Sequence, residues 1–124
     1  MISGEMMKGI IRNSYLENEN ILIVGYGKSG VKSSELAKRL GATVFVYDDN
    51  KDVEVNKEVV DKIYNSIEDI DFSNINITVL SPGVPLESDI AQKSIKSGVE
   101  TIGEIEFGFR YSYRNNTCDN RNKW

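Results

Sequence analysis

Residues 21–30 read ILIVGYGKSG, and this stretch decides the fold. Its first four residues, Ile21–Val24, form an uninterrupted aliphatic run, which is typical of a strand buried on both faces of a parallel sheet. The spacing of Gly25, Gly27 and Gly30 is G-x-G-x-x-G, which predicts a tight turn, close approach of a diphosphate, and close packing of a helix on the strand. The free N–H groups and the dipole at the start of that helix favour an anion. The stretch therefore predicts a nucleotide-phosphate site, although a tight turn that binds nothing has the same pattern.

Outward from this turn, the chain continues as one strand–helix–strand unit. We expect a helix over residues 29–40, with the small side chains Ser34 and Ala37 against the sheet and Gly41 just past its end. A second strand is predicted over residues 43–47.

The rest of the chain repeats the alternation of strands and helices. The further elements predicted, in chain order, are a helix over 54–63, a helical turn around 67–72, a strand over 75–80, a helix from Ser88 or Asp89 to Ser97, a strand over 99–102, and a helix from Glu104. This alternation predicts an α/β domain, Rossmann-like and three-layered, with a mostly parallel sheet.

Polar residues follow two of the predicted strands at the edge where such sheets bind ligands. The second strand closes with Asp48, Asp49 and Asn50, and the strand over 75–80 is followed by Ser81, Pro82 and Gly83. An acid after the second strand holds a ribose hydroxyl in dinucleotide enzymes, and it could equally accept the N3–H of uracil. In the glycine turn, Lys28 could neutralise a phosphate. Solvated turns and an exposed lysine remain the alternative interpretation of these residues.

Composition excludes several function classes. The 124 residues carry a net charge of −4, so they lack the basic face expected of a nucleic-acid-binding protein. No stretch has the roughly 20 apolar residues that span a bilayer, and residues 1–20 do not resemble a secretory signal. With no histidine and with Cys118 as the single cysteine, we expect no catalytic residue and no metal site. We expect a cytoplasmic protein.

Four segments in order resemble the N-terminal domain of Mur ligases, most closely of those that add D-glutamate. They are residues 21–30, Val46–Asp48, Leu80–Pro85 and Gly103–Phe107. The resemblance implies an ATP-dependent, amide-bond-forming enzyme of peptidoglycan synthesis. It implies that this domain binds the UDP end of UDP-N-acetylmuramoyl-L-alanine.

The resemblance also implies roles for particular residues. Lys28 and Ser29, within the turn formed by Gly25, Gly27 and Gly30, would meet the diphosphate. Two groups would border the uracil: Asp48, Asp49 and Asn50, and Ser81, Pro82 and Gly83. Two alternatives stay open: an NAD-binding module of an oxidoreductase or redox sensor, and a folded remnant that binds nothing.

The resemblance predicts a truncated ligase. Residues 1–20 are expected to be an N-terminal extension, 21–110 the UDP-binding domain, and 111–124 an aberrant, disordered tail where the family has the phosphate loop of its ATPase domain. ATP and Mg²⁺ would then belong to the full-length family, and this chain alone is expected to be inactive. Phe107 and Phe109 could be exposed at the former domain interface, a surface for self-association.

Overall fold

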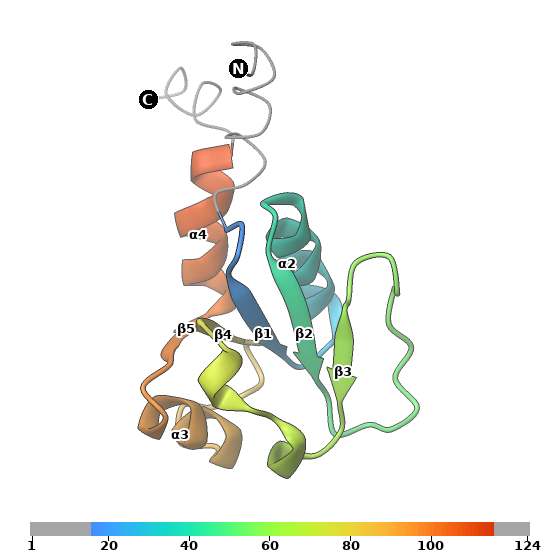
Figure 1. Cartoon of the computed structure of the whole chain (residues 1–124), viewed down its shortest axis with the longest axis vertical. Coiled ribbons are helices and arrows are strands. Elements are labelled where there is room, and N and C mark those ends of the chain that lie inside the picture. The colour runs from blue at the N-terminus through green and yellow to red at the C-terminus, as the bar shows by residue number, and fades with distance from the viewer. Residues whose placement is uncertain (1–15, 116–124) are drawn as a thin grey trace.

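The computed structural model describes residues 16–115 of the chain (Figure 1). The strands are β1 (Asn20–Val24), β2 (Thr43–Tyr47), β3 (Lys62–Tyr64), β4 (Ile77–Leu80) and β5 (Glu100–Gly103). The helices are α2 (Lys28–Arg39), α3 (Asp89–Lys96) and α4 (Glu104–Asn115), together with two short 3₁₀ turns, η1 (Ile67–Asp69) and η2 (Phe72–Asn74).

The strands form one sheet with the order β3-β2-β1-β4-β5, and every adjacent pair is parallel. This confirms the predicted α/β, Rossmann-like class and makes the described sheet wholly parallel. Ile23 in β1 stands beside Val46 on one side and Val79 on the other. The strand order reverses between β1 and β4, so the chain leaves these two strands in opposite directions, and a crevice opens at their carboxyl ends.

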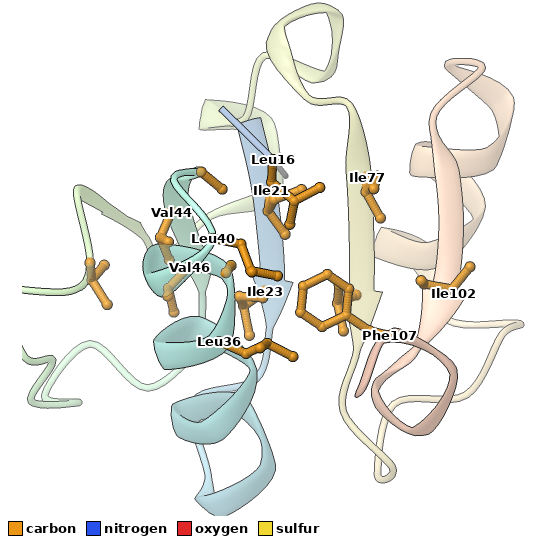
Figure 2. Packing of buried hydrophobic residues seen from close by; sticks show 14 residues of the cluster. Leu16, Ile21, Ile23, Leu36, Leu40, Val44, Val46, Ile77, Ile102 and Phe107 are labelled. Atoms are coloured by element: carbon orange, nitrogen blue, oxygen red, sulfur yellow. The ribbon is translucent and has the colours of Figure 1, made fainter. Parts of the chain in front are cut away.

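Two hydrophobic clusters cover the two faces of the sheet. α2 and α4 pack on one face, and α3 packs on the other together with the segment around η1 and η2. β2 alternates between them, since Val44 and Val46 join the first cluster while Phe45 and Tyr47 pack against the second. Figure 2 shows the ring of Phe107 pointing from α4 into the first cluster.

The glycine turn contains one very close contact, between Gly30 in α2 and Gly25, the residue after β1. A β-carbon on Gly30 would lie 1.9 Å from the carbonyl oxygen of Gly25, a separation that no real pair of atoms tolerates. Gly25 itself has a φ of +92°, which side chains rarely permit. The first and third glycines of the motif are therefore required by the backbone, whether or not a ligand binds.

The helix predicted over residues 54–63 is wrong. This segment contains turns, one of them closed by hydrogen bonds from the N–H groups of Val59 and Val60 to the Asn56 carbonyl, and then the edge strand β3. Asp61 ties it to β2, because its carboxylate accepts the N–H of Val44 at 2.8 Å and its own N–H donates to the Val44 carbonyl. The segment is rich in β-branched valines, which favour extended backbone over helix.

Ordered structure extends beyond residues 21–110 at both ends of the described chain. Leu16 is buried and donates its N–H to the Leu40 carbonyl, so residues 16–20 are part of the domain. α4 continues past residue 110 to Asn115, and the ring of Tyr111 packs at a tilt against that of Phe107, with 5.1 Å between the ring centroids. The expectations for residues 1–15 and 116–124, Cys118 included, lie outside the described residues.

The expected exposure of Phe107 is also wrong, because this side chain is completely buried beneath α4. Phe109, two residues further along the helix, is 75% exposed as expected. Residues two apart lie on different faces of a helix, so only one of the two can face the sheet.

We expect Gly30→Ala to lower the free energy of unfolding by about 1–3 kcal/mol, because the added methyl group would overlap the Gly25 carbonyl. Urea unfolding followed by circular dichroism measures the change. Gly27→Ala is the matched control, since nothing lies within 4 Å of its added β-carbon. Equal unfolding midpoints for the two variants would contradict this account of the turn.

Candidate functional site

The loops that follow β1, β2 and β4 meet at the carboxyl edge of the sheet and are joined by hydrogen bonds. The N–H of Gly25 donates to the Tyr47 carbonyl at 2.7 Å, and the N–H of Ser81 donates to the Val24 carbonyl at 3.1 Å. The Ser81 hydroxyl donates to the Gly25 carbonyl at 3.0 Å. The glycine turn is thus held from both sides, and a ligand would meet a preformed surface.

Asp48 holds the glycine turn in place. One of its carboxylate oxygens accepts the N–H of Tyr26 at 2.9 Å, and the other accepts the N–H of Asn50 at 2.9 Å. The Asn65 side chain, just after β3, donates to the Asp48 carbonyl at 2.9 Å. Both oxygens of the expected ribose-binding or uracil-binding acid are therefore already engaged with the backbone.

A cavity of about 350 Å³ opens between these loops and the start of α3. It brings together four of the residues singled out from the sequence: Gly25, Asp48, Asp49 and Gly83. The other residues that line it are Val24, Tyr47, Ile67, Val84, Pro85, Ser88, Asp89 and Ile90. Ser81 and Pro82 instead line a neighbouring cavity beyond the β4 loop. We refer to the larger cavity as the acidic cavity, because Asp48, Asp49 and Asp89 contribute to its wall.

The start of α2 has the opposite electrostatic character. Gly27 is its N-cap in extended backbone, no side chain among the described residues caps it, and its first turn contains no acidic residue. Lys28 is exposed and Ser29 half-buried at this end. The N–H groups and the positive end of the helix dipole at this terminus suit an anion. Asn50 is exposed on the β2 loop and is not among the residues that line the acidic cavity.

The acidic cavity also perturbs the phenol of Tyr47. Burial raises the pKa of Tyr47 above its ordinary value of 10.0, and the negative charges of Asp49, Asp48 and Glu68 raise it further. At neutral pH the phenol is therefore a neutral hydrogen-bonding group in the wall of the cavity, between an apolar surface and carboxylates.

Sequence reasoning missed several residues of this site. Tyr47 reaches the cavity because it faces away from the first core cluster, which the alternation in β2 could have indicated. Val84 directly follows the predicted Ser-Pro-Gly turn, so its position in the cavity wall could have been predicted from the sequence. No sequence pattern pointed to Asn65, because its hydrogen bond to the Asp48 loop depends on strand β3, which was not predicted from the sequence.

Within residues 16–115, no cluster of three or more acidic or cysteine side chains is suited to a metal ion. The same part of the chain contains no helix long and apolar enough to cross a bilayer.

Comparison with known proteins places these features in a family. Residues 19–103 match a family model described as Mur ligase MurD-like, N-terminal domain. The UDP-N-acetylmuramoylalanine--D-glutamate ligase of Caldicellulosiruptor saccharolyticus is 34% identical over 104 residues, which cover 77% of this chain and 23% of that protein. The protein of the same name from Thermoanaerobacter sp. is 33% identical over 105 residues, covering 78% and 23%. The chain spans less than a quarter of the length of these curated relatives.

We expect Asp48→Ala to destabilise the domain by about 1–3 kcal/mol, since two backbone N–H groups lose their charged acceptor. The matched control is Asp49→Ala, which removes the same charge from the adjacent, exposed position. We expect Asp49→Ala to change the free energy of unfolding by less than about 0.5 kcal/mol. Urea unfolding of the two variants tests the difference, and equal losses would refute a special role for Asp48.

The raised pKa of Tyr47 predicts a pH dependence of stability. Its pKa is higher in the folded than in the unfolded chain, so its stabilising contribution is present below about pH 10 and is lost as the pH rises through the folded pKa. Ultraviolet titration of the wild type against Tyr47→Phe isolates this phenol. Asp49→Asn should lower its pKa part of the way toward 10.0. An unchanged titration in Asp49→Asn would rule out the electrostatic contribution.

Proposed function

The chain belongs to the MurD-like family of Mur ligases as their N-terminal domain, and from this premise we propose that it binds the UDP end of UDP-N-acetylmuramoyl-L-alanine. In this proposal the domain holds a substrate of peptidoglycan synthesis while other parts of a longer ligase carry out the reaction. In the same proposal, ATP and Mg²⁺ would bind in those other parts of the ligase.

The observation that carries the proposal is the pairing of two complementary surfaces at one edge of the sheet. The uncapped start of α2 favours the diphosphate, and the adjoining acidic cavity repels anions and favours hydrogen-bond donors. A nucleoside diphosphate has an anionic diphosphate at one end and a base with hydrogen-bond donors at the other, so it can match both surfaces at once. Its phosphates would lie at Gly27, Lys28 and Ser29, and its base would enter the cavity.

Asp49 is the carboxylate best suited to the base in this arrangement. It lines the acidic cavity and is exposed, whereas both oxygens of Asp48 already accept backbone N–H groups. The N3–H of uracil is a donor that a carboxylate can accept. The same engagement of Asp48 weakens the case for NAD, whose ribose hydroxyls would need this acid as their acceptor.

We expect calorimetric titration with UDP-N-acetylmuramoyl-L-alanine to show binding, and titration with NAD to show none. Gly27→Val should weaken the binding of the UDP compound by about tenfold or more, because the valine side chain would occupy the space that the diphosphate needs.

The fold should survive this substitution, because residue 27 has extended backbone and nothing within 4 Å of a β-carbon there. Circular dichroism of Gly27→Val provides the control. Binding of NAD alone would replace the proposal with the dinucleotide alternative, and binding of neither ligand would reject both.

A further inference from the structure

α4 has large apolar side chains on its outer side as well as on the side that packs on the sheet. Ile105 and Phe109 are 77% and 75% exposed, and residues four apart lie on the same face of a helix. Leu86 lines a cavity together with Ile105 and is 53% exposed. We refer to Leu86, Ile105 and Phe109 as the outer patch. Among residues 16–111, four large apolar side chains are exposed, and three of them form this patch.

A cavity of about 330 Å³ between α2 and α4 lies on the flank of the outer patch. Charged side chains of both signs line it: Lys32, Glu35 and Arg39 from α2, and Glu104 from α4. Glu104 also lines the cavity that contains two members of the patch, so the two surfaces are continuous. Gly108 lies in the wall as well, and nothing lies within 4 Å of a β-carbon built on it. The surface of α4 is therefore open to side chains of another molecule.

The charges beside the patch indicate which kind of partner fits. A nucleic acid or an anionic membrane surface needs a basic surface, but here two cations and two carboxylates cancel. None of these four side chains forms an ion pair with another residue of the described range. A surface that is apolar at its centre and carries both charges at its side is complementary to a second copy of itself.

The direction of the two helices determines how such copies could meet. α2 and α4 each follow a strand of the parallel sheet and lie side by side, so both start at its carboxyl edge (Figure 1). Glu104 is the first residue of α4, whereas Arg39 is the last residue of α2. The two charges therefore lie toward opposite ends of the groove. A twofold axis across the groove would bring Glu104 of each copy toward Arg39 of the other.

We propose that the outer patch is the contact surface for a second copy of this chain, with the two α4 helices packed antiparallel about a twofold axis. Ile105 of each copy lies on Phe109 of the other at the apolar centre. Glu104 and Arg39 of opposite copies form an ion pair on each side of it. The inference does not rest on the proposed function, since no residue of the outer patch lines the acidic cavity.

Sedimentation equilibrium of the whole chain over a series of concentrations tests the proposal. We expect reversible association to twice the mass of one chain with a micromolar dissociation constant, as for a small, transient interface. Ile105→Ser and Phe109→Ser should each weaken the association by about tenfold or more, because each removes an apolar contact at the centre. Both positions are exposed, so the fold should survive, and circular dichroism checks this.

Ile95→Ser is the matched control for these variants. Ile95 is the fourth exposed large apolar side chain, 42% exposed, and it lies on α3 outside the patch. The control should associate as tightly as the wild type.

Exchanged charges test the antiparallel arrangement itself. Glu104→Lys alone and Arg39→Glu alone should each weaken self-association by about tenfold, because like charges then face each other across the axis. A mixture of the two variants should regain the association of the wild type, since both facing pairs are again of opposite sign in the mixed dimer.

Each result decides the matter. A chain that stays monomeric at every concentration overturns the proposal and leaves the patch to another occupant, such as other parts of a longer ligase. Association that persists in both serine variants, or that Ile95→Ser weakens equally, also overturns it. If the mixture of charge variants associates no better than either variant alone, the antiparallel pairing is refuted.

Discussion

The structure depends on the contact between the backbone of Gly25 and that of Gly30. The space that a side chain on residue 30 would fill is occupied by the carbonyl oxygen of Gly25, the residue after β1, so the start of α2 lies directly against the backbone of the turn. This closeness fixes the start of α2 at the carboxyl end of the central strand. It also brings Ser34 and Ala37, both fully buried, onto the sheet. The position of the anion-favouring helix terminus is thus a consequence of packing and does not depend on a ligand.

In the proposed site, the two aspartates after β2 have different roles, one in support of the loops and one in recognition of the base. Asp48 accepts backbone N–H groups from the glycine turn and from its own loop, and it links two loops that are far apart in the chain. Asp49 is exposed beside it and contributes its charge to the cavity and to Tyr47. A preformed site needs both roles, because a binding group is precise only when the loop that bears it is itself held.

Much of the fold could be predicted from the sequence, because local patterns determined it. The aliphatic run predicts β1, the glycine spacing predicts the turn into α2, and the apolar residues of 43–47 predict β2. Ser88 caps α3, as its residue type indicates. The segment 54–63 could not be predicted this way, since its valines have helical spacing while the pairing of Lys62–Tyr64 with β2 decides its structure. Phe107 and Phe109 are indistinguishable until the position of α4 on the sheet is known. The cavities are less predictable still, because Ile67, Val84 and Ile105 line them from parts of the chain that are far apart in sequence.

The order of the strands has a consequence for how the sheet meets other molecules. β3 and β5 form its two edges, and each edge strand presents backbone groups that could pair with a foreign strand. β3 is only three residues long and carries Lys62, and β5 carries Glu100, whose carboxylate binds Arg110. Short, charged edges are poor templates for strand addition. The edges of the described sheet therefore disfavour strand addition, whereas its carboxyl end is hollowed by cavities.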